Sequence, residues 1–548
     1  MVTTYLPHQP VSAVKRLLSA ALAVSSLASV ATAQGSPWFG EDALVLSRGM
    51  VRLGIAPTWT RFDQRYRADG ELEPLAVDLQ TESLDATRLS ILAPVRERLE
   101  ALGPTPDIAV SLGRLRVDRD ASIFSVPLSA ELGIGARLSL GIMVPIVRTI
   151  AGAVLRPNPS VNEGNIGINP ALDSEAARNV NDALLSQFAS AIGALEALID
   201  ACADPGNPDP RCPEARTPEA QELVNNATAF ATGLGELYSE TGSLFVPVTG
   251  SPFDVTIRGR VTSFAESFGG FDINDITSAG PQGAVIAGAS DMIRILTDPE
   301  FGLRAERIST RTTIGIGDIE VGALLQLLNT VQRDTLQRYG SGVRAAIGAT
   351  FRMGTGRADN PDDFVDVPTG DGQHDVELRT QWDLLLGSRV GLGLGGRYTL
   401  QLADREIVRI AGPHQPFAAY WRRQEVDRDL GDIVDVQVTP RVALGSFFSL
   451  MAQYRARRKA EDTHTGRFNV TDDLGDPVTL DASILDAETE QREDRVSIGL
   501  GYSTLTSVAR NRARIPLEIF LQYGESIRGS GGKTPKVSVG VVQLRVYF

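Results

Sequence analysis

The chain has 548 residues, a formal net charge of −14 and only two cysteines. An acidic chain without a basic stripe argues against nucleic acid as a partner, and the Cys and His residues lack the spacing of a metal site. We therefore expect no cofactor, no bound metal and no nucleic acid. A mean hydropathy near zero and 6% aromatic residues suit a soluble protein and a β-barrel equally, so the periodicity has to separate these classes.

Residues 1–33 have the layout of a secretory signal. Lys15 and Arg16 precede the uncharged stretch 17–30, and Ala31-Thr32-Ala33 forms a small-residue cleavage site. Cleavage after Ala33 removes the two basic residues and no acid, so the net charge of the exported chain becomes −16. No later run of 18 or more uncharged apolar residues occurs, and no helical membrane span is expected.

Strict alternation of apolar and polar residues recurs along the rest of the chain. In 376–402, for example, Leu378 and Trp382 share one face while Arg379 and Asp383 lie on the other. The pattern predicts twelve strands, at about 48–66, 107–134, 137–152, 309–328, 342–355, 372–386, 389–405, 431–444, 446–461, 491–505, 514–527 and 536–548.

These strands are too long for the obvious alternative, a sandwich of two packed sheets. Sandwich strands average about six residues, whereas a strand tilted in a bilayer needs about 9–11. Very short turns also alternate with long acidic loops, as in outer-membrane barrels. We therefore predict an all-β transmembrane barrel over residues 34–548, with about 12 antiparallel strands and both chain ends on the periplasmic side.

The chain closes with an alternating strand, Val537–Phe548. Pairing of this strand with the first would remove the free sheet edges that lipid does not tolerate. Tyr547 and Phe548 resemble the carboxy-terminal signal by which the barrel assembly machinery recognises its substrates. Outer-membrane lipid and that machinery are the expected partners, and the outer membrane of a Gram-negative-type bacterium is the expected location.

The polar face of the strands carries both signs of charge. Its charged residues, which we predict to face the lumen, are Glu131, Asp318, Glu320, Arg344, Arg352, Glu377, Arg379, Asp383, Arg397, Asp435, Arg441, Glu518 and Arg545. Mixed charge indicates ion pairs and water rather than an ion filter of a single sign. Twelve strands also give a barrel narrower than the 16–18-stranded porins, so a small or partly plugged channel is expected.

Residues 153–308 form an insertion between the third and fourth strands that is too long for a plain loop. Its apolar spacing predicts helices at 171–201 and 217–238. Cys202 and Cys212 would staple this extracellular hairpin, because an exported chain favours a disulfide over two free thiols. A short helix is expected at 291–296 and another in a second insertion, at 82–102. A gate and an inert lid are both compatible with these helices.

Few residues suggest chemistry. The histidines beyond the signal, His374, His414 and His464, lie on or beside expected outer loops, and His374 neighbours Asp371 and Asp375. Solvated loop residues explain them more simply than catalysis, and no enzyme activity is expected. The acidic run 358–375 either binds calcium or carries solvated charge, since spacing alone does not show that six to eight oxygens converge.

Three segments resemble a known family: VPLSAELGIGARLSLGIMVPIV (126–147), GIGDIEVGALLQL (315–327) and MGTGRADNPDDFVDVPTGDGQHDVELRTQWDL (353–384). They are similar to transporter-like outer-membrane proteins of the phenol meta-pathway degradation family and, more distantly, to long-chain fatty-acid transporters. The resemblance covers 121–152 and 309–548, without the insertion. Gln34 to Ser47 is shorter than the amino-terminal plug of the fatty-acid transporters.

The resemblance implies a channel for passive uptake of small, hydrophobic or aromatic molecules. The alternative is a structural or adhesive surface protein in which the barrel is an anchor and the helical insertion binds a partner.

Overall fold

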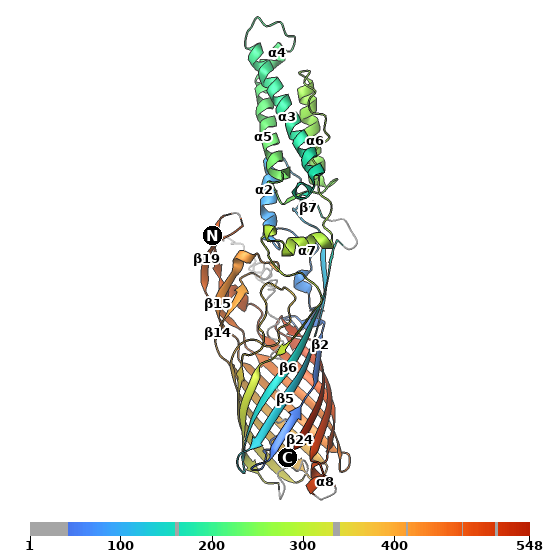
Figure 1. The fold of residues 1–548 in the computed structure, drawn as a ribbon, viewed down its shortest axis with the longest axis vertical. Coiled ribbons are helices and arrows are strands. Elements are labelled where there is room, and N and C mark those ends of the chain that lie inside the picture. The colour runs from blue at the N-terminus through green and yellow to red at the C-terminus, as the bar shows by residue number, and fades with distance from the viewer. Residues whose placement is uncertain (1–41, 159–163, 332–339, 413–414, 474, 510–512) are drawn as a thin grey trace, which may run out of the picture.

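The computed structural model describes residues 42–158, 164–331, 340–412, 415–473, 475–509 and 513–548. The predicted signal, 1–33, lies outside these ranges. One sheet closes on itself into an antiparallel barrel (Figure 1), and twelve chain passes build its wall. The passes are β1 (Val51–Ile55) with β2 (Thr58–Phe62), β5 (Leu115–Gly133), β6 (Leu138–Pro157), β9 (Arg311–Ile316) with β10 (Ile319–Asn329), β11 (Gly342–Met353), β12 (Asp375–Leu386), β13 (Val390–Gln401), β16 (Ile433–Ala443), β17 (Phe448–Lys459), β21 (Gln491–Ser503), β22 (Leu517–Ser530) and β24 (Ser538–Tyr547). The predicted strand count is confirmed.

The last strand closes the barrel against the first. β24 pairs with both β1 and β2 on one side and with β22 on the other. Phe548 and Val51 exchange backbone hydrogen bonds of 2.9 and 3.0 Å. The prediction of a sealed edge is confirmed.

Two chain passes are interrupted in a way that the alternation did not predict. The first pass breaks at Ala56-Pro57, where proline has no N–H to give to the sheet, and the fourth breaks at Gly317-Asp318. The chain stays attached to its neighbours at both breaks, since Ala56 N donates to Pro127 O at 3.1 Å and Gly317 N donates to Pro145 O at 2.9 Å.

The two faces of the wall differ in exposure as in composition. On β12, Leu378, Trp382 and Leu386 are 55%, 43% and 65% exposed, whereas Arg379 and Asp383 between them are buried. Large apolar side chains are therefore on the outside and charged ones inside, the reverse of a soluble fold. This arrangement is the one required when lipid replaces water as the outer solvent.

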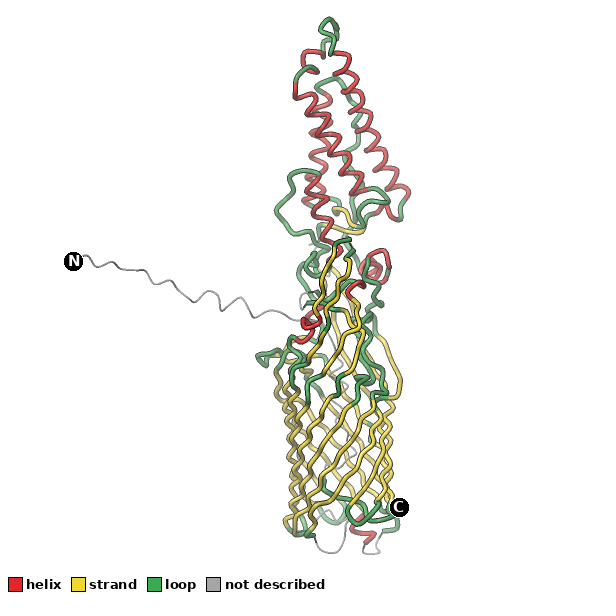
Figure 2. Tube along the Cα trace, turned by 90° about the vertical axis from the view of Figure 1, so that its left-hand side faces the viewer, coloured by secondary structure: helices red, strands yellow, loops and turns green. Residues whose placement is uncertain are grey.

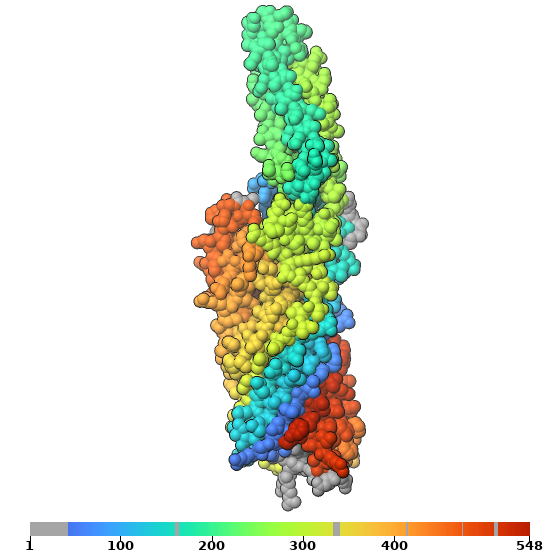
Figure 3. All heavy atoms as spheres, in the orientation of Figure 1, coloured from blue at the N-terminus to red at the C-terminus, as the bar shows by residue number. Residues whose placement is uncertain are grey.

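Short hairpins and turns rise from the extracellular rim. They comprise β3 (Gln64–Tyr66), β4 (Leu72–Pro74) and β23 (Thr534–Pro535) in one sheet, β14 (Asp404–Arg409), β15 (Arg423–Asp429) and β18 (Thr463–Thr465) in a second, and β19 (Arg467–Thr471) with β20 (Pro477–Asp481) in a third. Figure 3 shows the hairpins of the second and third sheets, in orange, beside the base of the helical insertion. At the opposite rim a short helix, α8 (Leu505–Ala509), follows β21.

The helical insertion stands above the barrel as a tower (Figures 1 and 2). It contains β7 (Ile166–Ile168), α3 (Glu175–Cys202), α4 (Cys212–Ala215), α5 (Pro218–Tyr238), β8 (Phe245–Pro247), α6 (Pro252–Gly269) and, at its base, α7 (Ala289–Thr297). Phe188, Phe230 and Phe264 from the three long helices pack together with ring centroids 5.1–5.8 Å apart. The disulfide between Cys202 and Cys212 is present at the far end of the α3–α5 hairpin.

One helix prediction needs correction, and one helix was not predicted. The helix expected at 82–102 forms only over α2 (Ala93–Ala101), because the chain from Thr81 to Asp85 bridges instead to Leu115 and Ser111. The helix α6 was not predicted, since β-branched residues and glycine lower its intrinsic helix propensity. Its signal was nevertheless present: Ser251 caps it, and Phe253, Ile257, Val261, Phe264 and Phe268 lie along its buried face.

Candidate functional site

The barrel interior is lined by the charged rows. Of the thirteen charged residues predicted to face the lumen, Asp318, Arg352 and Arg441 are partly buried and the other ten are buried. Asp318 lies in the break between β9 and β10, where it accepts a hydrogen bond from Gly356 N at 2.8 Å. The burial of these residues supports our proposal that all thirteen face the lumen.

Most of these charges are held in pairs. Arg352 binds Glu320 and Asp375 at 3.2 and 2.8 Å, and Arg441 binds Asp383 at 3.1 Å. Arg52, which was not in the predicted set, is bound to Glu131 through Nη2 contacts of 2.5 and 2.6 Å. The signal for Arg52 was available, since it alternates with Val51 and Leu53 on the first strand.

Over the middle of the barrel, between Arg119 at the mouth and Glu131 at the other end of β5, the charge is confined to one side of the interior. Between the outer mouth and the periplasmic end, the inward residues of β5 and β6 are uncharged. They are Ala121, Ile123, Ser125, Pro127, Met143, Pro145, Val147, Thr149 and Ala151. The strands from β11 to β21 instead carry arginines and carboxylates, so the lumen has an apolar wall and a charged wall.

A short segment before the first strand occupies the periplasmic part of the lumen. Asp42 to Leu46 are buried, although they form no helix or strand. The Ala43 and Leu46 amides donate to Asp383 Oδ2 and Ser139 Oγ, both at 2.9 Å, and Gln326 Nε2 donates to Ala43 O at 3.1 Å. The segment is short, as the sequence indicated, but these five residues still lie across the interior.

A cavity of about 140 Å³ lies at the extracellular mouth. Apolar side chains line part of it, including Leu75, Leu79, Phe364, Ile407 and Leu430. The polar part of its lining includes Arg65, Arg119, Asp359, Glu406, Arg428, Lys459, Asp462, His464 and Lys533. We call this cavity the chamber, and its mixed lining suits a small molecule with an apolar body and a polar group.

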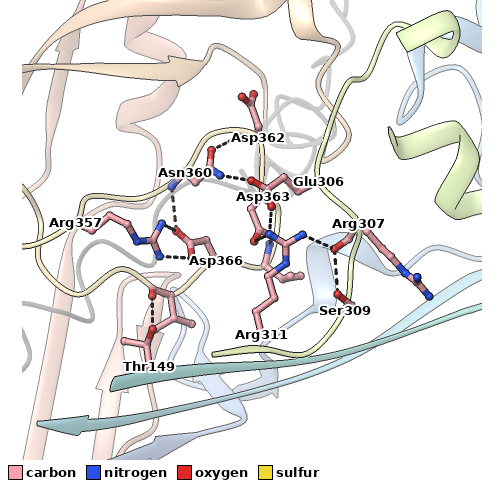
Figure 4. A network of polar contacts seen from close by, with 12 residues as sticks. Thr149, Glu306, Arg307, Ser309, Arg311, Arg357, Asn360, Asp362, Asp363 and Asp366 are labelled. Carbon is pink, nitrogen blue, oxygen red and sulfur yellow. Dashed lines mark hydrogen bonds and ion pairs between the residues drawn. The ribbon is translucent and has the colours of Figure 1, made fainter. Parts of the chain in front are cut away.

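The loop 354–374 covers one side of the chamber and is fixed by ion pairs (Figure 4). Arg357 donates two hydrogen bonds of 2.7 Å to the Asp366 carboxylate. Asn360 Nδ2 donates to Glu306 Oε1 at 2.7 Å, and Thr149 Oγ1 on β6 donates to Val367 O at 2.9 Å. The loop is therefore tied both to itself and to the barrel wall.

The acidic residues of this loop do not behave as predicted. Asp363, Asp366, Asp371 and Asp375 are buried rather than solvated. Asp363, Asp366 and Asp375 pair with Arg311, Arg357 and Arg352, and the Asp371 carboxylate accepts a hydrogen bond from Gln373 N at 3.1 Å. Among the described residues no three acidic, His or Cys side chains form a group that could hold a metal ion. Arg311 and Arg352 come from β9 and β11, so spacing within the loop did not show these pairs.

The histidines are not brought together. His374 is exposed on the outer face, where its ring stacks on Phe351, while Asp371 and Asp375 point inward. His464 lines the chamber and its Nδ1 lies 2.9 Å from Asp486 Oδ1. His414 lies outside the described residues. The predicted neighbourhood of His374, Asp371 and Asp375 therefore does not form a site.

Two acids of the chamber are protonated more readily than usual. Burial raises the pKa of Glu406 to about 7, with a smaller opposing effect of Arg428. Burial, followed by the charge of Asp366, raises the pKa of Asp359 well above its usual range. Near neutral pH a protonated Glu406 is thus able to donate a hydrogen bond into the chamber.

Replacing Glu406 by Gln is expected to stabilise the protein at pH 8 but not at pH 5. A carboxyl with a raised pKa in the folded state binds its proton more tightly there than in the unfolded chain. Its contribution to the free energy of unfolding is therefore fully present below the unfolded pKa of 4.5 and is lost as the pH rises through about 7. This decrease in the free energy of unfolding amounts to about 3 kcal/mol. Thermal unfolding at the two pH values measures it, with the exposed Glu425→Gln on the same hairpin as control. If Glu406→Gln changed the unfolding temperature equally at both pH values, the raised pKa of Glu406 would be contradicted.

Tyr547 and Phe548, the predicted insertion signal, differ in their surroundings. The Tyr547 hydroxyl donates to Glu518 Oε2 at 2.6 Å inside the barrel, and Phe548 is 71% exposed. The exposed ring is accessible at the periplasmic rim, and its recognition by the assembly machinery stays a prediction.

The fold defines a closed, twelve-stranded transmembrane β-barrel with a roofed outer mouth. None of the known protein-family models and none of the curated proteins matches this sequence.

Solved structures that are similar include an outer membrane channel from Pseudomonas putida F1, with 10% identity, a TM-score of 0.39 and coverage of 92% of this chain and 98% of that one. A Pseudomonas aeruginosa FadL homologue has 8% identity and a TM-score of 0.28, and the P. putida toluene transporter TodX has 9% identity and a TM-score of 0.25. Each alignment covers 92% of this chain and 90% of the other. Because the identities and TM-scores are this low, these structures say nothing about the solute of the present protein.

Proposed function

We propose that the protein is an outer-membrane channel for passive uptake of small, hydrophobic or aromatic molecules. The observation that carries this proposal is the chamber at the extracellular mouth. It places apolar side chains such as Leu79 and Phe364 beside buried polar groups, directly above a lumen with one apolar wall. A solute with an apolar body finds apolar contacts both in the chamber and along β5 and β6.

The tower is not part of the proposed passage. The chamber lining comes from the rim loops and hairpins, and none of it comes from the tower residues 164–300. Figures 1 and 2 show the tower on the extended ends of β5 and β6. We therefore propose that the tower is not the gate.

Solute flux in liposomes tests this proposal. The comparison is between the full chain and a chain in which a short linker replaces residues 164–287. Asn158 Nδ2 donates to Ala287 O at 3.2 Å, so the two ends are close enough to be joined. Val95 and Leu99 of α2 are changed to Ser in the shortened chain, because removal of α5 would expose these buried apolar side chains to water.

We expect equal flux of a small aromatic solute through both chains. A higher flux through the shortened chain would make the tower a gate. No flux through either chain, with the barrel folded, would overturn the channel and favour the alternative, an anchor for a surface-exposed binding domain.

A further inference from the structure

The charged wall contains polar groups that its ion pairs leave unused. Arg397 on β13 is 8% exposed, and its Nε has no hydrogen-bond partner among the described residues, although the charges of Glu377 and Asp435 act on it. Its neighbour in the register, Asp435 on β16, is held by Arg455 through an Nε contact of 2.5 Å. A buried donor that is left without an acceptor is costly, so this position is suited to receive an anion.

Two further donors lie one step toward the periplasm. Gln381 and Gln437 flank Gly395 in the register, are 1% and 4% exposed, and each has an Nε2 without a hydrogen-bond partner. Their amides converge over Gly395, where an added Cβ would lie 2.7 Å from Gln437 Nε2 and 2.9 Å from Gln381 Oε1. Because Gly395 has no side chain, both amides are able to lie close over its backbone.

Positive charge exceeds negative charge around these donors. We counted the charges among the residues paired in register with Arg397 and with Gly395 across β12, β13, β16, β17 and β21, and added Glu377 just above them. There are five arginines and three acids. They are Arg379, Arg397, Arg455, Arg457 and Arg495, with Glu377, Asp435 and Glu493.

Some of the acid groups near these rows are themselves neutralised. Asp435 Oδ1 has no hydrogen-bond partner, but its second oxygen is bound by Arg455. Nearer the mouth, Glu320 and Asp375 share Arg352. An anion that leaves the chamber therefore meets a site of net positive charge.

We infer that this part of the lumen is a binding site for organic anions with an apolar body, such as aromatic sulfonates or carboxylates. The inference rests on the proposed function and names its solute class. Arg397, Gln381 and Gln437 bind the anionic group from β12, β13 and β16. The apolar body faces the uncharged inner surface of β5 and β6. These strands lie five and four strands away from β13 around the ring of twelve chain passes, and thus across the lumen from it.

Ligand-observed NMR on the full chain in detergent tests the site with three probes. Benzenesulfonate carries the ring and the charge, benzenesulfonamide the ring alone, and methanesulfonate the charge alone. We expect benzenesulfonate to bind most tightly, and Arg397→Gln to weaken it about tenfold, the cost of a lost hydrogen bond to a charged group. Gln437→Leu removes a donor without changing the charge and is expected to weaken the same probe by less. Arg148→Gln, on the exposed outer face of β6, is the matched control and should change nothing.

Equal binding of benzenesulfonate and benzenesulfonamide would overturn the inference, as would unchanged binding in folded Arg397→Gln protein. Equal binding of methanesulfonate and benzenesulfonate would remove the role of the apolar wall. The measurement is independent of transport: binding without flux in liposomes would refute the channel and keep the site, whereas flux without a preference for the aromatic anion would refute only the site.

Discussion

A chain that begins at Ser47 is expected to conduct small solutes several-fold better than the natural one. Asp42 to Leu46 lie buried inside the lumen and are held there by hydrogen bonds from β6, β10 and β12. Ala43 and Val45 also pack against Met143, Leu324 and Ala346. Because the segment has no ladder bonds of its own, removing it opens the interior without breaking the wall.

Single-channel conductance in planar bilayers measures this effect. A chain that begins at Asp42 is the matched control, because it keeps the buried segment and loses only what precedes it. That control should conduct like the natural chain. Equal conductance of the Ser47 and Asp42 forms would show that the segment does not obstruct the passage.

Replacing Glu131 by Ala is expected to cost roughly 3–5 kcal/mol of folding stability, because it leaves the Arg52 charge buried without its partner. Both side chains are almost fully buried, and the pair joins β1 to β5 beside the closing strand. Arg52 also lies under the Tyr547 ring, at 5.8 Å from its centroid. The pair thus stabilises the seam where the two ends of the chain meet.

Urea unfolding in lipid vesicles measures the loss. The double change Arg52→Met with Glu131→Leu removes both charges and is expected to cost much less than the single change. Asp118→Ala breaks an ion pair with Arg156 whose side chains are more than half exposed, and about 1 kcal/mol or less is expected. A similar loss in all three variants would contradict a special role of the buried pair.

Much of the barrel was predictable because lipid outside and a polar interior make apolar and polar residues alternate with a period of two along each strand. Residues such as Leu378, Arg379, Trp382 and Asp383 alternate for the length of each strand, and a one-residue slip would put every charge into lipid. The alternation thus predicted the number of strands, the closing strand and the faces of the charged residues.

The candidate site was less predictable, since its chemistry depends on partners that are far apart in the chain. Spacing placed Arg397 on a polar face but did not show that Asp435 is taken by Arg455. It also placed Asp363 and Asp366 in an acidic run without showing the arginines that neutralise them. The interior position of Asp42 to Leu46 depends on side chains more than 90 residues away, and no local pattern encodes such contacts.

The sequence by itself determined the sealed barrel, its lipid-facing surface and the stapled helical hairpin, because these follow from local periodicity and from two cysteines close in the chain. Only the tertiary structure decided which charges are paired, what lies in the lumen, and that the mouth is roofed by loops rather than by the tower. The physical reason is that pairing and occupancy depend on distances across the closed ring, which exist only after the strands have been assembled.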